Sequence, residues 1–321
     1  MKLYSAIFAI LFITLNALAC TGNNKKESPA QPEEVFDIHI SDMSARDPFI
    51  FADPETKMYY LAVNGGSNVK MYKSKDLTMW KDEGIVFQPQ ADFWGKADFW
   101  APDMYFYKGK YYLFVTFSGA DKIRGTSILV SDMPSGQYEP LVNKPTTPAD
   151  WMALDGALYL DEKGTPWMLY CHEWLQVKDG EIIAQQLSED LKTAVGEPIV
   201  LFTASQAPWT PDYDPNENYV TDAPVINKMA DGKLVMTWSS FGKDKKYNIG
   251  VCYSENGLLG PWVHDEQPMV DNDGGHAMLF KDFDGQMKIS YHSPNSGGPA
   301  RITIQPVRYE AGKLFIDKAA L

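Results

Sequence analysis

Residues 100–115 read WAPDMYFYKGKYYLFV, in which two runs of aromatic and aliphatic residues flank the short turn Lys108-Gly109. Such runs, bounded by glycine, proline, asparagine and aspartate, are typical of β-strands joined as a hairpin. The same alternation continues from about Val35 onward, and no long segment shows the 3.6-residue apolar period of a helix. The segment therefore predicts a β-hairpin within an all-β chain.

Four further segments repeat this pattern of a polar residue, an apolar strand, a turn and a second aromatic-rich strand. The leading polar residues are Asp47, Asp103, Asp155, Asp222 and His276, separated by 56, 52, 67 and 54 residues. This spacing suits one four-stranded antiparallel sheet per repeat, and radial repetition of such sheets is a β-propeller. We therefore expect an all-β fold, a five-bladed β-propeller of four-stranded antiparallel blades, over residues 36–321. A β-sandwich would not need five similar units, and β-helix repeats are much shorter.

The propeller geometry predicts where the polar residues gather. If the first strand of each blade is innermost, the five leading residues ring one mouth of the central channel. The second strand returns to that mouth, which would bring Glu173 near Asp155 and place Asn64 and His292 in similar positions. Carboxyl groups at close range raise one another's pKa, so one of them can stay protonated near neutral pH. A carboxylic acid beside a carboxylate is what hydrolysis of an acetal requires.

The first 35 residues have a different composition. Met1-Lys2 precedes a nearly continuous apolar run from Leu3 to Ala19, as in a signal peptide spanning residues 1–19. The sequence Ala17-Leu18-Ala19-Cys20 resembles a bacterial lipobox, so we expect lipid attachment at Cys20 and a flexible tether over residues 20–35. The alternative is an ordinary signal peptide cleaved nearby. The predicted location is the bacterial envelope, either in the periplasm or on the cell surface.

Charge and cysteine content limit the partners. Acidic residues outnumber basic ones by 42 to 29, for a net charge of −13. The negative electrostatic potential that this charge creates repels the phosphates of a nucleic acid but not a neutral sugar, so we expect no nucleic-acid partner. Cys171 and Cys252 lie in apolar runs and are predicted to be buried free thiols, with no cysteine and histidine spacing that suggests zinc. The oligomeric state is left open.

Five motifs, taken together, resemble glycoside hydrolase family 43. They are Arg46-Asp47-Pro48, Trp100-Ala101-Pro102-Asp103, Leu154-Asp155-Gly156, Thr221-Asp222-Ala223-Pro224 and Gly275-His276. Each is weak alone, but the set follows the family's order over about residues 42–308. The resemblance implies a five-bladed propeller that hydrolyses arabinose- or xylose-containing plant polysaccharides and needs no cofactor for its chemistry.

The resemblance also implies roles for the carboxyl groups. Asp47 would be the general base that activates water, and Asp155 a third acid that orients the proton donor and adjusts its pKa. The family usually has a glutamate followed by Gly-Pro where this chain has Asp222. The shorter side chain retracts the carboxyl by roughly 1 Å, and a misplacement on that scale can cost about a hundredfold in rate. The donor is therefore either Asp222 or Glu173, which follows Cys171-His172.

Four other residues match family positions or suit sugar binding. His276 matches the central histidine that helps to hold a metal ion, often calcium, or a water cluster. Arg301 resembles an arginine near the C-terminal end of the family's domain that reaches a sugar hydroxyl, and Trp100 suits stacking against a sugar ring. Asp103 would tie down the start of blade two near the substrate.

The function implied by this resemblance is the release of α-L-arabinofuranosyl units from neutral plant polysaccharides or oligosaccharides, with inversion. A β-xylosidase, xylanase or endo-arabinanase is the nearest alternative. A non-catalytic glycan-binding lipoprotein is a further alternative, because the usual glutamate is missing from blade four.

Overall fold

The computed structural model describes residues 34–317. The chain divides into two units, residues 1–35 and 36–321, of which the second is the β-rich unit. The predicted signal peptide, Cys20 and nearly all of the predicted tether lie outside the described residues. Within residues 34–317, no helix is long and apolar enough to cross a membrane.

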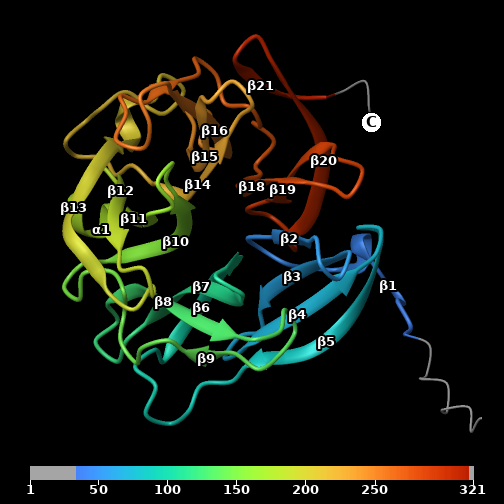
Figure 1. The fold of residues 1–321 in the computed structure, drawn as a ribbon. Coiled ribbons are helices and arrows are strands. Elements are labelled where there is room, and N and C mark those ends of the chain that lie inside the picture. The colour runs from blue at the N-terminus through green and yellow to red at the C-terminus, as the bar shows by residue number, and fades with distance from the viewer. Residues whose placement is uncertain (1–33, 318–321) are drawn as a thin grey trace, which may run out of the picture. The chain divides into compact units, whose positions relative to one another are not determined.

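Residues 36–317 form the five-bladed β-propeller expected from the repeats (Figure 1). Each blade is an antiparallel sheet whose four strands follow chain order from the centre outward. Blades one and two consist of β2 (Phe49–Asp53), β3 (Met58–Asn64), β4 (Val69–Ser74), β5 (Met79–Phe87), β6 (Ala97–Tyr107), β7 (Lys110–Ser118), β8 (Arg124–Ser131) and β9 (Glu139–Pro140). Blades three and four consist of β10 (Ala153–Leu160), β11 (Pro166–His172), β12 (Glu181–Leu187), β13 (Ala194–Thr203), β14 (Asp222–Lys228), β15 (Leu234–Phe241), β16 (Tyr247–Ser254) and β17 (Val263–His264). Blade five consists of β18 (Gly275–Lys281), β19 (Met287–Ser293), β20 (Arg301–Glu310) and β21 (Lys313–Ile316).

Helical structure is minor within residues 34–317. The α-helix α1 (Trp174–Val177) follows β11, and the 3₁₀ turns η1 (Ile40–Asp42) and η2 (Ala204–Gln206) lie between strands. The first strands of neighbouring blades contact one another around the centre, so their starts share one end of the channel.

The same backbone feature recurs at that end of every blade. In blades two to five the ladder between the first two strands is interrupted by a β-bulge, after Trp100, Leu154, Asp222 and Gly275. The residue that follows each of these has a left-handed backbone, and so does the residue two before β2. These five residues are Asp47, Ala101, Asp155, Ala223 and His276, with φ between 46° and 57°. Strained backbone of this kind costs about 1 kcal/mol or more per residue and clusters at functional sites.

The bulges correct the register predicted from the sequence. Asp47, Asp155 and His276 occupy equivalent positions, as expected. In blade two the equivalent residue is Ala101 rather than Asp103, and in blade four it is Ala223 rather than Asp222. Backbone geometry defines the equivalent position independently of the side chain. Asp103 therefore lies two residues beyond it, and Asp222 lies one residue before it.

Aromatic side chains fill the space between blades. Phe87, Phe93, Phe99 and Phe117 pack edge to face, with ring centroids 4.9 Å apart for Phe99 and Phe117. Such pairs contribute about 0.5–1.5 kcal/mol each beyond their buried area. Phe99 is therefore part of the core. Cys171 and Cys252 are buried free thiols, as the sequence predicts.

The two ends of the propeller pair with different blades. The last strand, β21, pairs with β20 inside blade five. The N-terminal segment adds β1 (Ile38–His39) as a fifth strand at the outer edge of blade one, next to β5. A single bridge between Ser44 and Arg301 joins the N-terminal segment to blade five.

Candidate active site

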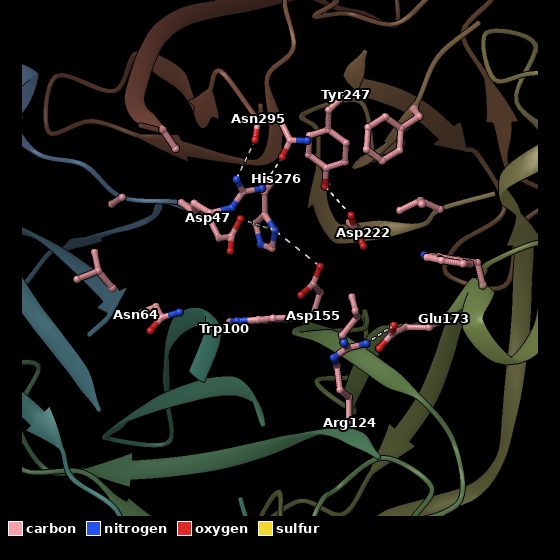
Figure 2. A pocket seen from close by; sticks show the side chains of 18 of the residues that line it. Asp47, Asn64, Trp100, Arg124, Asp155, Glu173, Asp222, Tyr247, His276 and Asn295 are labelled. Atoms are coloured by element: carbon pink, nitrogen blue, oxygen red, sulfur yellow. Dashed lines mark hydrogen bonds and ion pairs between the residues drawn. The ribbon is translucent and has the colours of Figure 1, made fainter. Parts of the chain in front are cut away.

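A cavity of about 870 Å³ opens at the end of the channel where the bulges lie (Figure 2). This volume is typical of a small-molecule binding site. Six of the residues predicted from the sequence line it: Asp47, Trp100, Asp155, Glu173, Asp222 and His276. Asn64 lines it too, at the far end of β3, as the strand topology predicts.

Asp47 is held among nitrogen atoms. Its Oδ1 atom lies 3.3 Å from Nδ1 of His276 and 3.3 Å from Nδ1 of His292. Burial by itself would raise the pKa of Asp47, but His276, His292 and Arg46 together outweigh it and hold the pKa below its usual range. Burial also lowers the pKa of His276 to about 4, so that ring is neutral at pH 7 and Arg46 supplies the formal positive charge. Asp47 is therefore a carboxylate at neutral pH.

Asp155 connects the centre of the cavity to blade four. Its own backbone N–H donates to Oγ1 of Thr116 (3.0 Å), and its Oδ2 accepts a hydrogen bond from the N–H of Ala223 (3.0 Å). In blade five the equivalent N–H, that of His276, donates to Oγ of Ser239 on the preceding blade. Cys171 stands at that position in blade three, and a thiol is a weak acceptor, so the Asp155 carboxyl takes the bond instead. Burial, Asp222 and Asp47 raise the pKa of Asp155 well above its usual range.

Asp222 is paired with a tyrosine. The hydroxyl of Tyr247 donates to its Oδ2 atom at 2.7 Å. Burial raises the pKa of Asp222 to about 7, although the Tyr247 hydrogen bond opposes the rise; the charges of Asp47 and Glu173 add to it. The Tyr247 ring is stacked on His292, with centroids 5.9 Å apart, and this contact helps to fix the position of the hydroxyl.

Glu173 is paired with an arginine instead. Nη1 of Arg124 donates to its Oε2 at 2.5 Å, and Nε of Arg124 contacts Asp98 at 3.3 Å. The Arg124 guanidinium also covers one face of Trp100, with Cζ 4.8 Å from the ring centroid. Burial raises the pKa of Glu173, and the contact with Arg124 opposes that shift.

Calcium binding at His276, with water as most of the ligands, stays a prediction. The Nδ1 atom of His276 faces Asp47 and lies 3.7 Å from Asp155 Oδ2. Within residues 34–317, no group of three or more histidine, cysteine, aspartate or glutamate side chains has the arrangement of a metal site. Imidazole is also a poor ligand for calcium, which prefers oxygen. No step of the chemistry below is assigned to a metal.

Two predicted binding residues lie elsewhere. Arg301 is exposed at the start of β20, and its Nη1 donates to the backbone carbonyl of Asp42. Its neighbour Ala300 lines the cavity; because successive residues of an extended chain point to opposite sides, Arg301 points away. Asp103 is buried below the cavity, where Tyr105 donates to its Oδ2 and burial raises its pKa well above the usual range. Contact of either residue with a sugar stays a prediction.

Sequence reasoning missed Arg124 and Tyr247. Each is the first residue of the third strand of its blade, β8 and β16, and each pairs with the last residue of the second strand. A third strand starts at the end where the second finishes, so its first residue also lies at the mouth of the channel. That rule, applied to the repeats, would have identified both.

The cavity thus combines carboxyl groups whose pKa values are driven apart. Asp47 is ionised at pH 7, whereas Asp222 has a pKa near 7 and Asp155 a raised one. Environments that separate the pKa values of neighbouring acids are how a site assigns a base and an acid. This arrangement can deprotonate a water molecule and protonate a leaving oxygen in one site.

Known proteins are similar to this chain in sequence and in fold. The sequence profile described as "Glycosyl hydrolases family 43" matches residues 36–314. An endo-arabinase of known structure from Bacteroides thetaiotaomicron VPI-5482 is 54% identical, with a TM-score of 0.84, over 87% of this chain and 100% of that one.

Two curated relatives are more distant. An extracellular exo-alpha-(1->5)-L-arabinofuranosidase from Cellvibrio japonicus (strain Ueda107) is 25% identical over 260 residues, 74% of this chain and 72% of that protein. Extracellular endo-alpha-(1->5)-L-arabinanase 1 from Bacillus subtilis (strain 168) is 28% identical over 120 residues, 34% of this chain and 37% of that protein. Members of this family need no cofactor for catalysis. Because the family profile covers nearly the whole propeller, the chain belongs to glycosyl hydrolase family 43 and is a glycosidase.

Proposed function

We propose that this chain hydrolyses α-L-arabinofuranosyl linkages of plant polysaccharides or oligosaccharides, with inversion. The observation that carries the proposal is that Asp47, with a lowered pKa, shares one cavity with Asp222, whose pKa is about 7. The choice of arabinose is supported by the 54% identity to the Bacteroides endo-arabinase. No positive patch is needed, because the substrate is neutral.

The roles of the three aspartates follow from their surroundings. Asp47 accepts a proton from water as the water oxygen attacks the anomeric carbon. Asp222 gives its proton to the leaving oxygen as the glycosidic bond breaks, so Asp47 ends protonated, Asp222 ends ionised, and exchange with solvent restores both. Asp155 accepts the N–H of Ala223, the residue after Asp222, and so positions the backbone that carries the donor.

Trp100 is proposed to bind the sugar ring. One face of its indole is covered by Arg124, and the residue lines the cavity beside Asp155 (Figure 2). The other face would stack against the apolar face of a sugar. Trp174 and Phe241 also line the cavity and would contact neighbouring sugar units.

The order of product release tests the activity. We expect linear α-1,5-arabinan to yield L-arabinose as the first product, measured by anion-exchange chromatography during the first few per cent of hydrolysis. A ladder of oligosaccharides before arabinose would instead establish endo action, which the name of the 54% identical relative favours. Release of xylose from xylan, with arabinan untouched, would contradict the choice of arabinose.

The pKa of Asp222 predicts a pH profile. Because the donor must be protonated, kcat/KM should fall as the pH rises through about 7, whereas the low pKa of Asp47 keeps the acidic limb well below the usual range of an aspartate. Tyr247→Phe removes a hydrogen bond that favours the ionised form. We expect its alkaline limb to move upward by about one pH unit.

The matched control for this profile is Tyr309→Phe. Tyr309 also donates to an aspartate, Asp231, at 2.8 Å, but it is outside the cavity. Its pH profile should coincide with that of the wild type. An unchanged alkaline limb in Tyr247→Phe would contradict the assignment of Asp222 as the group that titrates.

We also propose that the enzyme is exported and attached to the bacterial envelope through Cys20. The support is the sequence of residues 1–20 and the extracellular location named for the relatives from Bacillus subtilis and Cellvibrio japonicus. Labelling of the intact protein with a radioactive fatty acid in a bacterial host, lost in Cys20→Ser, would test the anchor.

A further inference from the structure

Arg124, Glu173 and Trp100 form a connected group in the wall of the cavity (Figure 2). They come from three elements: Arg124 begins β8, Glu173 follows β11 and Trp100 lies in β6. Arg124 touches Glu173, Asp98 and the Trp100 ring, so its guanidinium is held in one orientation. We call these three residues the arginine–glutamate site.

One atom of this site lacks a partner. Glu173 is only 4% exposed, and its Oε1 atom is buried without a hydrogen bond from any residue in the described part of the chain. A buried acceptor left unpaired costs about 1–3 kcal/mol, and more when it is charged. Glu173 lines the cavity, so a turn of its carboxyl group toward the cavity would let a ligand supply the missing donor.

Arg124 has donors to spare beside that acceptor. Its contacts with Glu173 Oε2 and Asp98 Oδ2 use two of the five N–H groups of a guanidinium. The remaining N–H groups can only donate hydrogen bonds, and Glu173 Oε1 can only accept them while the carboxyl group is ionised. The site therefore offers one acceptor next to a set of donors.

This combination matches two adjacent hydroxyl groups. One hydroxyl donates to Glu173 Oε1, and the neighbouring oxygen accepts from Arg124. A uronic acid suits the site poorly, because its carboxylate would compete with Glu173 for Arg124 and face the other acids of the cavity. We propose that the arginine–glutamate site recognises two adjacent free hydroxyls of a neutral sugar unit, and that Glu173 binds substrate and does not donate the proton.

The proposal rests on the proposed function and narrows it. An arabinofuranosyl unit carries adjacent hydroxyls at its second and third carbons. A branch at either of those oxygens would remove a hydroxyl donor for Glu173 Oε1 or add bulk against Arg124. We therefore expect the enzyme to bind unbranched units and to reject units substituted at either position.

Binding without turnover tests the site directly. In an Asp47→Asn background, which removes the proposed base, isothermal titration with α-1,5-L-arabinotriose and with β-1,4-xylotriose measures affinity alone. We expect Glu173→Gln and Arg124→Lys each to weaken binding of the better ligand by about tenfold or more. Glu189→Gln, which alters an exposed glutamate paired with Lys108, is the matched control and should change nothing.

Kinetics of the variants with an intact Asp47 separate binding from proton donation. Glu173→Gln should raise KM for arabinotriose with a much smaller effect on kcat, and the alkaline limb of kcat should stay near that of the wild type. A second probe, arabinotriose methylated at the second and third hydroxyls, should bind poorly to the wild type, and Glu173→Gln should discriminate less against it.

The outcomes distinguish this proposal from the proposed function. If xylotriose binds and arabinotriose does not, the choice of arabinose fails, and the effect of Glu173→Gln on xylotriose still decides the site. Unchanged affinity for the bound sugar in both variants would overturn the arginine–glutamate site. So would a collapse of kcat in Glu173→Gln at unchanged KM, and so would the absence of binding of either sugar to folded Asp47→Asn protein.

Discussion

Asp47→Asn should lower kcat/KM for arabinotriose by about a thousandfold. The variant keeps the size of the side chain and removes the charge that accepts the proton of water. Asparagine also tolerates the left-handed backbone that position 47 adopts, at φ 54°, better than alanine does. The loss of activity can therefore be assigned to the missing carboxylate and not to a rearranged backbone at position 47.

Two measurements would test this assignment of the loss to the missing carboxylate. The midpoint of thermal unfolding of Asp47→Asn should lie close to that of the wild type, and Asp190→Asn, at an exposed surface position, should retain full activity. If Asp47→Asn keeps more than a tenth of the wild-type kcat/KM, Asp47 is not the base.

Asp222→Asn should have the second largest effect, and the size of that effect should depend on the leaving group. Hydrolysis of arabinotriose needs protonation of a poor leaving oxygen, so we expect a loss of at least about a hundredfold. An aryl arabinofuranoside with an acidic phenol leaves without protonation, so most of its rate should remain. The alkaline limb near pH 7 should disappear with Asp222.

Glu173→Gln is the comparison that decides between the two acids. Its loss should be similar for arabinotriose and for the aryl substrate, because a binding defect does not depend on the phenol. If Glu173→Gln instead shows the leaving-group dependence and Asp222→Asn does not, the donor assignment must be exchanged.

The repeats predicted the blades but not their register. Strand, turn and aromatic periodicity are local properties, so the five units could be found directly in the chain. In blades three to five the residue at the bulge donates its backbone N–H to a side chain of the preceding blade, as Asp155 does to Thr116 Oγ1, and such contacts depend on the assembled ring. For that reason Asp103 was placed at the mouth of the channel, where the structure has Ala101.

The predicted site shows the same division. Asp47 and Asp155 belong to motifs at equivalent left-handed backbone positions, and both line the cavity. Arg124 and Tyr247 belong to no motif, and they matter because of what they touch: Glu173 in one case and Asp222 in the other. The first contact joins blades two and three, and the second joins two strands of blade four. Neither has a signature within a single strand.

The five-bladed all-β architecture, the free thiols and the acids that gather at one end of the channel could be predicted from residue type and spacing. The differences among those acids depend on the folded ring: Asp47 has nitrogen neighbours, Asp222 has a tyrosine, and Glu173 has an arginine. Residue type and spacing repeat along a chain and can be read from it. A pKa depends on burial and on charges within a few ångströms, and those neighbours are brought together only when the blades close into a ring.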